Sequence, residues 1–200
     1  MSGRPQPIGV ILAGGLGRRI GGSKALVKLR GRPLITYPLE AMKGALSEVV
    51  ILVKADTELP SLPGETVWIE PADLRHPLLG IVQAIGLAGG LPVLVCAVDL
   101  PFVTSELIGR IASADALGAP AVLAACAGAV QPLLGCYQPS AIEPLSRALV
   151  ERGVPVKEAI GGIQPRLLEV DDPDTLFNVN APDDLLQASA MLDRRRVSRT

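Results

Sequence analysis

The stretch GVILAGGLGRRIGGSK, residues 9–24, joins a short apolar run to a glycine-rich loop that carries arginine and lysine. Residues 8–12 are apolar without alternation, which predicts a strand covered on both faces of a sheet. The loop leaves the carboxyl end of that strand, where open α/β sheets bind their ligands. Glycines let backbone amides approach a ligand closely, and Arg18, Arg19 and Lys24 add positive charge. The stretch therefore predicts a polyphosphate-binding loop after the first strand.

Two widespread nucleotide-binding motifs do not fit this loop. The dinucleotide pattern G-x-G-x-x-G, started at Gly15, continues to Gly17 but then meets Ile20. A P-loop needs a lysine that is followed by Ser or Thr, whereas Ser23 precedes Lys24 in this chain. An ordinary flexible turn with solvated arginines is the alternative interpretation.

Apolar β-branched runs alternate with helical patterns along the chain, which predicts an α/β fold. We expect a three-layer, Rossmann-like arrangement: a mostly parallel sheet of about seven strands with helices on both faces. The helix starts carry two signals, a capping-box spacing at Ser140 and Glu143 and the sequence Pro182-Asp183-Asp184 in a first turn. The expected strands are 8–12, 49–53, 66–69, 92–98, 121–126, 132–137 and 166–170. The expected helices are 34–46, 80–87, 104–114, 140–151 and 182–192.

Composition favours one globular domain over residues 1–192, followed by a short basic tail at 193–200. The chain has 200 residues, 48% of them hydrophobic, and a formal net charge of -1. A near-neutral charge argues against a general nucleic-acid binder. No signal-peptide core is recognisable, and Gly, Pro or Asp interrupts each apolar run before it reaches membrane-spanning length. We therefore expect a cytoplasmic protein without a membrane segment.

The cysteines predict a reducing compartment rather than a disulfide framework. Cys96, Cys126 and Cys136 lack the C-x-x-C spacing of metal and redox motifs, and each falls in an expected strand, where it serves as a small apolar residue. The less favoured alternative is a nucleophilic cysteine, for which His76 is the sole imidazole base in the chain.

Asp99 is the candidate metal ligand. It follows the apolar strand 92–98, so its carboxylate is expected at the carboxyl edge of the sheet, beside the glycine-rich loop. Mg²⁺ prefers hard oxygen ligands and commonly combines one or two carboxylates with substrate phosphates and water. The alternative is a structural one, in which Asp99 caps a turn before Pro101.

The segment LAGGLGRRIGGSK, residues 12–24, resembles the signature L-A-G-G-x-x-x-R-[M/I]-G-x-x-K of nucleotidyltransferases with the nucleotide-diphospho-sugar-transferase fold. Within that superfamily the sequence is most similar to the molybdenum-cofactor guanylyltransferases, and the similarity covers nearly the whole chain. The further matching stretches are RGRPLI (30–35), HPLLGI (76–81), VCAVDLPF (95–102), QPLLGCY (131–137) and FNVNAPDDL (177–185).

This resemblance implies transfer of GMP from GTP to molybdopterin or Mo-molybdopterin, with Mg²⁺ as the cofactor held by Asp99. It also implies that cofactor-delivery proteins or molybdoenzymes are partners. Arg19, Lys24 and Asp99 are then the catalytic residues, and Asn178 and Asn180 lie on the molybdopterin side. In an extended segment those two asparagines share one face, although Asn180 is also suited to capping the last helix. The implied nucleotide-binding residues are Leu12, Ala13, Gly14, Gly15, Lys24, Asp73, Gly80 and Asp99.

The expected base-contact residues depart from the family pattern. Leu52-Val53-Lys54 stands where an asparagine is frequent, and Glu70-Pro71 stands where an aspartate is expected. Asp73 is one candidate to replace that carboxylate, and backbone groups are the other. A molybdopterin cytidylyltransferase, another small nucleotidyltransferase and a non-catalytic nucleotide-binding accessory protein are therefore the competing interpretations.

Overall fold

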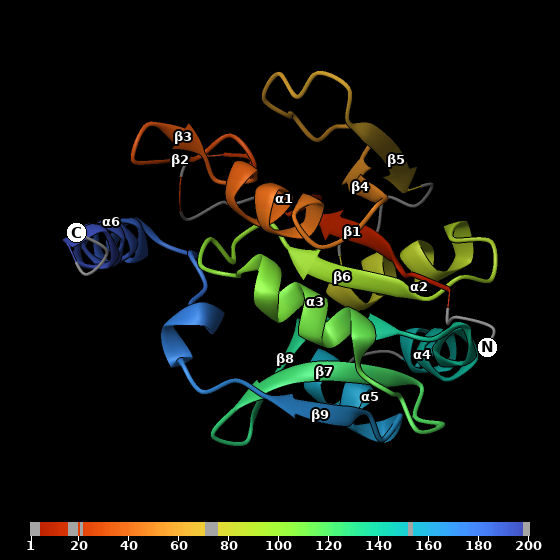
Figure 1. The fold of residues 1–200 in the computed structure, drawn as a ribbon. Helices are drawn as coiled ribbons and strands as arrows, with labels where there is room; N and C mark the ends of the chain where they lie inside the picture. The colour runs from red at the N-terminus through yellow and green to blue at the C-terminus, as the bar shows by residue number, and fades with distance from the viewer. Residues whose placement is uncertain (1–4, 16–19, 21, 71–75, 152–153, 198–200) are drawn as a thin grey trace.

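The computed structural model describes residues 5–15, 20, 22–70, 76–151 and 154–197 (Figure 1). Within these residues seven strands form one sheet in the order β5-β4-β1-β6-β8-β7-β9. Each of the seven expected strands is present, with ends that differ by at most a few residues. The strands are β1 (Ile8–Leu12), β4 (Val49–Lys54), β5 (Thr66–Glu70), β6 (Val93–Ala97), β7 (Ala121–Cys126), β8 (Ala129–Tyr137) and β9 (Arg166–Glu169).

The sheet is mostly parallel, as the alternating pattern predicts. β5, β4, β1 and β6 are parallel neighbours, and β9 runs parallel to β7. β8 is antiparallel to both β6 and β7. The reason is local: Ala127 and Gly128 connect β7 to β8, and both have positive φ, the geometry of a tight hairpin turn. The start of β8 therefore lies at the edge of the sheet where β6 ends.

Helices cover both faces of the sheet, because successive residues of β1 point to opposite sides. Ile11 packs with residues of α1 and α3, whereas Val10 packs with residues of α2, α4 and α5 (Figure 1). The three-layer prediction is confirmed. The helices are α1 (Thr36–Lys43), α2 (Pro77–Leu87), α3 (Ser105–Ser113), α4 (Ile142–Val150), α5 (Val156–Gly162) and α6 (Pro182–Val197), with short 3-10 turns at η1 (Pro139–Ala141) and η2 (Pro173–Leu176).

The capping-box prediction at Ser140 is wrong. Ser140 lies inside η1, and α4 begins at Ile142 after Ala141, which makes no side-chain cap. Pro139 starts the 3-10 turn, so the chain enters the helix without needing a hydroxyl cap. The sequence did not predict α5 or a small hairpin of β2 (Lys28–Leu29) with β3 (Arg32–Pro33).

The last helix starts where the sequence predicts, at Pro182. Asp184 Oδ2 accepts hydrogen bonds from the backbone N–H groups of Asn180 and Ala181, each at 2.8 Å. α6 continues to Val197, so the first residues of the expected basic tail are helical. Ala188 and Met191 of this helix form a separate apolar cluster with Leu29, Leu34, Phe102 and Val179. Among the described residues, none of the helices has both the length and the apolar character needed to cross a membrane.

Substitution of Gly135 in β8 tests how tightly β8 packs against β7. A Cβ at this position would lie 2.6 Å from the Val122 carbonyl oxygen and would also meet the Leu123 side chain. We expect Gly135→Ala to lower the free energy of unfolding by about 1–3 kcal/mol, measured by urea denaturation. Gly109→Ala in α3 is the control: no atom lies within 4 Å of the place its Cβ would take, so it should stabilise by about 0.5–1 kcal/mol. Equal unfolding midpoints for the two variants would contradict this account.

Candidate active site

Four parallel strands end at the same edge of the sheet, and a cleft of about 440 Å³ opens there. The end of β1 and the glycines after it form one wall, and the last residues of β4 and β5 form another. The chain after β6 and the first turn of α2 complete the cleft. The lining residues are Leu12, Gly14, Gly15, Lys24, Lys54, Glu70, His76, Pro77, Gly80, Ala97, Val98, Asp99 and Leu133.

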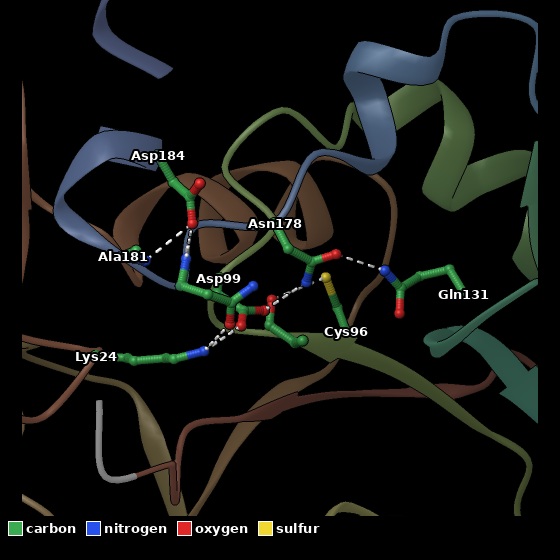
Figure 2. A network of polar contacts seen from close by, with 9 residues as sticks. Lys24, Cys96, Asp99, Gln131, Asn178, Ala181 and Asp184 are labelled. Carbon is green, nitrogen blue, oxygen red and sulfur yellow. Dashed lines mark hydrogen bonds and ion pairs between the residues drawn. The ribbon is translucent and has the colours of Figure 1, made fainter. Parts of the chain in front are cut away.

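Lys24 and Asp99 form an ion pair in this cleft. Lys24 Nζ lies 2.5 Å from Asp99 Oδ2 and donates a second hydrogen bond to Asn180 Oδ1 at 2.6 Å (Figure 2). Asn178 Nδ2 donates to the other carboxylate oxygen, Asp99 Oδ1, at 3.1 Å. The glycine-rich loop, the end of β6 and the segment before α6 therefore meet at one carboxylate, as the sequence-based hypothesis requires.

The surrounding backbone holds this network in place. Val98 N–H donates to Leu12 O at 3.2 Å, which ties the end of β6 to the end of β1. Val179 N–H donates to Asp99 O at 2.9 Å, which places the asparagine segment directly over the carboxylate. Asp99 is only 8% exposed, and a buried charge is tolerated when it is paired and hydrogen-bonded.

Asn178 and Asn180 both face the Lys24–Asp99 pair, as their spacing in an extended segment predicts. Gln131 Nε2, from the start of β8, donates to Asn178 Oδ1 at 2.8 Å and orients that amide (Figure 2). Asn180 turns its oxygen to Lys24, while Asp184 accepts from the backbone N–H groups of Asn180 and Ala181, just before the last helix. The alternative interpretation, in which Asn180 caps α6, does not describe this arrangement.

The structure brings most of the predicted nucleotide-binding residues to the cleft. Ala13 differs from its neighbours, because it is fully buried in the core and its N–H donates to Leu52 O at 2.9 Å. Arg19 and Asp73 lie outside the described residues, as do Arg18 and Pro71. The predicted residues that line the cleft are Leu12, Gly14, Gly15, Lys24, Gly80 and Asp99.

Lys54 and Glu70 also line the cleft; the sequence marks them only as departures from the family's expected base-contact pattern. They end the neighbouring strands β4 and β5, and Lys54 Nζ donates to Glu70 Oε2 in a buried ion pair. Gln131 was also missed, because only the antiparallel direction of β8 brings it to this edge. The position of Lys54 and Glu70 at the ends of expected strands could have predicted that they reach the cleft. Nothing in the sequence around Gln131 indicated its place in the site.

His76 and Cys96 have structural roles. His76 Nδ1 accepts a hydrogen bond from the Leu78 N–H at 3.3 Å, so the imidazole caps α2 at the rim of the cleft. Cys96 is fully buried, and its Sγ donates to the Ala97 carbonyl at 3.6 Å. Burial raises the pKa of the Cys96 thiol well above its usual range, and the negative charge of Asp99 raises it further. A nucleophilic role needs an accessible thiolate, so Cys96 is unsuited to it.

The described residues contain no cluster of three or more His, Cys, Asp or Glu side chains arranged to hold a metal ion. Asp99 instead offers one carboxylate within a group of amides. Such a site suits a cation that takes most of its ligands from phosphate and water, which is the usual behaviour of Mg²⁺.

Residues 9–162 match the family model described as MobA-like NTP transferase domain. The chain belongs to this family. Among its relatives, the molybdenum cofactor guanylyltransferase of Cereibacter sphaeroides is 34% identical over 188 residues, which cover 92% of this chain and 96% of the relative. The molybdenum cofactor guanylyltransferase of Rhizobium leguminosarum bv. trifolii is 31% identical over 211 residues, with 97% of each chain covered.

A solved structure shows the same fold as this MobA-like protein. The molybdopterin-guanine dinucleotide biosynthesis protein A of Archaeoglobus fulgidus superposes with a TM-score of 0.75 at 25% identity. The match covers 93% of this chain and 98% of the archaeal one. The cleft, the Lys24–Asp99 pair and the asparagine segment therefore belong to a MobA-like nucleotidyltransferase fold.

Thiol accessibility tests the assignment of Cys96 as a structural residue. Native protein treated with iodoacetamide should be alkylated at Cys126, which is partly exposed, while Cys96 and Cys136 stay unmodified until urea unfolds the chain. Peptide mass spectrometry at successive times measures this order. Alkylation of Cys96 as fast as Cys126 in the native protein would show that the thiol is accessible and would reopen the nucleophile interpretation.

Proposed function

We propose that this MobA-like protein transfers GMP from GTP to the terminal phosphate of molybdopterin and releases pyrophosphate. The guanylyltransferase relatives that cover nearly the whole chain support the substrates. The observation that carries the chemistry is the contact between Lys24, from the glycine-rich loop, and Asp99, from the end of β6. This contact brings together, in one cleft, a cation that can bind phosphate oxygens and a carboxylate that can bind a metal ion.

The reaction needs no nucleophile from the protein. A phosphate oxygen of molybdopterin attacks the α-phosphorus of GTP, the new P–O bond forms, and the bond from that phosphorus to the bridging oxygen breaks. The electron pair leaves with pyrophosphate. Because the attacking oxygen is already anionic, catalysis consists of alignment and stabilisation of negative charge. The inaccessibility of the buried Cys96 thiol agrees with a site that lacks a covalent intermediate.

Each part of the cleft then has a task. The backbone of Leu12, Gly14 and Gly15 holds the nucleotide at the end of β1, and Gly80 lets the first turn of α2 approach it. Lys24 stabilises charge on the α-phosphate and the leaving pyrophosphate. The further nucleotide contacts assigned by motif are Arg19 to phosphate and Asp73 near the base.

Asn178 and Asn180 place the acceptor. Their amides reach Asp99 and Lys24 from the segment before α6. The N–H groups of a side-chain amide donate to phosphate oxygens, and its oxygen binds a metal ion or accepts from a lysine. This segment therefore suits the phosphate end of molybdopterin, where attack begins.

Asp99 is the residue that would hold Mg²⁺, and the donor set fits that ion. Its carboxylate is a hard oxygen ligand, and the Asn180 amide oxygen, which accepts from the same lysine, is compatible with the same cation. When bound, Mg²⁺ neutralises phosphate oxygens and favours departure of pyrophosphate. Lys24, now paired with Asp99, becomes available to a phosphate oxygen once another cation balances the carboxylate.

We also infer that the reaction takes place in the cytoplasm and that the product passes to a delivery protein or a molybdoenzyme. The free cysteines Cys96, Cys126 and Cys136 agree with a reducing compartment. Cell fractionation tests the location, and recovery of the protein outside the cytoplasm would overturn it.

Replacement of Lys24 tests the phosphate-binding role. We expect Lys24→Ala to lower the rate of guanylyl transfer by about 10²–10³, because one preorganised cation no longer stabilises the developing charge. Pyrophosphate release with GTP, Mg²⁺ and molybdopterin measures the rate. Lys43→Ala is the matched control, since that lysine pairs with Glu65 at 2.6 Å and does not line the cleft. A folded Lys24→Ala protein with near-normal turnover would refute the assignment.

Titration with Mg²⁺ tests the role of Asp99. In the wild type, Mg²⁺ should raise the melting midpoint seen with GTP well above that seen with GTP and EDTA, because the ion binds the native complex. Asp99→Asn should lose most of this Mg²⁺-dependent increment and most of the turnover. An undiminished increment in Asp99→Asn would place the metal elsewhere.

Parallel thermal-shift titrations with GTP, CTP, ATP and UTP test which base the protein prefers. Equal shifts of the melting midpoint for all four nucleotides would contradict guanylyl transfer.

A further inference from the structure

A relay of hydrogen bonds connects the start of β8 to the carboxylate of Asp99. The Leu133 N–H donates to Gln131 Oε1 at 3.4 Å. Gln131 Nε2 donates to Asn178 Oδ1 at 2.8 Å, and Asn178 Nδ2 donates to Asp99 Oδ1 at 3.1 Å (Figure 2). These bonds all run in one direction, from the backbone of β8 to the carboxylate. We call the side chains of Gln131 and Asn178 the amide relay.

The direction of the amide relay is fixed at both of its ends. A backbone N–H can only donate, and an ionised carboxylate can only accept. A side-chain amide can be turned by half a rotation, which exchanges its donor and its acceptor. Because Leu133 supplies a donor and Asp99 supplies an acceptor, only one orientation of the two amides satisfies every bond. Hydrogen bonds in such a series polarise and strengthen one another.

An irregularity in β8 places Gln131 at the start of the relay. The register between β7 and β8 shifts between Leu123 and Ala125, and Gln131 lies in the part of β8 that faces this shift. The next residue, Pro132, has no N–H for a neighbouring strand, and its carbonyl accepts from the buried Tyr137 hydroxyl at 2.6 Å. Irregularities of this kind occur next to active sites, where they redirect a side chain.

We propose that Gln131 is a positioning residue that acts through Asn178 on the carboxylate of Asp99, an inference that rests on the proposed guanylyl transfer. Gln131 binds the amide oxygen of Asn178, so the nitrogen of that amide faces the site. The nitrogen then holds one carboxylate oxygen of Asp99 and leaves the other, Oδ2, directed to Lys24. A carboxylate that is fixed by an outer hydrogen bond presents its free oxygen to a cation in a defined geometry.

The opposite orientation of Asn178 would work against the proposed chemistry. Its oxygen would face Asp99 Oδ1, and two acceptors without a proton between them repel each other. The same oxygen would also be turned to the side on which the proposed function places the acceptor phosphate, which is negative. The Gln131 amide therefore decides whether Asn178 presents a donor or an acceptor to the reacting groups.

Gln131→Glu tests the direction of the relay, because the new side chain keeps the shape but cannot donate to Asn178 while it is ionised. We expect the Mg²⁺ concentration that gives half of the Mg²⁺-dependent rise in melting midpoint with GTP to increase by about 10- to 100-fold. The kcat of guanylyl transfer should fall by a similar factor. Added negative charge alone would have the opposite effect, because it attracts Mg²⁺. Gln131→Met removes the polar atoms without adding charge and should raise the same Mg²⁺ concentration by about 10-fold.

The side-chain amide of Asn178 reports the positioning directly, in protein without nucleotide or metal. Its N–H signals in nuclear magnetic resonance spectra are identified by their absence in Asn178→Asp. In Gln131→Glu and in Gln131→Met these signals should shift, and their exchange with water should become about 10-fold faster, because one hydrogen bond no longer holds the amide. A role of Gln131 in packing alone would not change the signals of this amide in a protein of unchanged melting midpoint.

Gln138→Glu is the matched control, because Gln138 lies just past the other end of β8, donates to Cys136 Sγ at 3.8 Å and does not line the cleft. It should match the wild type in every readout. Unchanged Asn178 signals in a folded Gln131 variant overturn the proposal, and so does a Mg²⁺ concentration at or below that of the wild type. If Gln131→Glu does not fold, Gln131→Met decides by the same readouts. A wild type that transfers no GMP refutes the proposed function, whereas the Asn178 signals still decide the positioning role.

Discussion

β1 and β6 lie side by side in parallel register, from Ile8 opposite Val93 to Leu12 opposite Ala97. Both strands therefore end at the same level, and whatever follows each of them meets at one edge of the sheet. Lys24 follows the first strand and Asp99 follows the second, which is why residues 75 positions apart form an ion pair. The asparagine segment depends on this pairing too, because the Val179 N–H is bound to the backbone oxygen of Asp99.

Among the described residues, the cleft contains two ion pairs with different geometry. Lys24 reaches Asp99 from a loop, and an asparagine oxygen shares its ammonium group, so the contact can be exchanged for a phosphate without moving a strand. Lys54 and Glu70 stand on paired strand residues, where the sheet fixes both backbones. The first arrangement suits charge that develops during a reaction, whereas the second is a fixed part of the cleft wall.

The sequence predicts the layers well because continuous apolar runs and helical spacing are local signals of burial. Prediction from the sequence fails where a neighbouring residue or strand determines the local structure. Ser140 has the letters of a helix cap, but Pro139 begins the turn earlier. The direction of β8 depends on the two-residue turn at Ala127, whose positive φ is not signalled by alanine. Gln131 reaches Asn178 only as a result of that direction.

Three local features of the sequence were sufficient to predict the α/β sheet and the edge that carries the proposed site. They are the order of the apolar strands, the glycine-rich loop with its lysine, and the acid that follows the fourth long apolar run. The partners of each side chain were decided by tertiary structure. Strand order set Lys54 against Glu70, and the return of the chain before α6 brought Asn178 to Asp99. Pairing across the sheet depends on register and direction, which are long-range properties that local residue patterns do not encode.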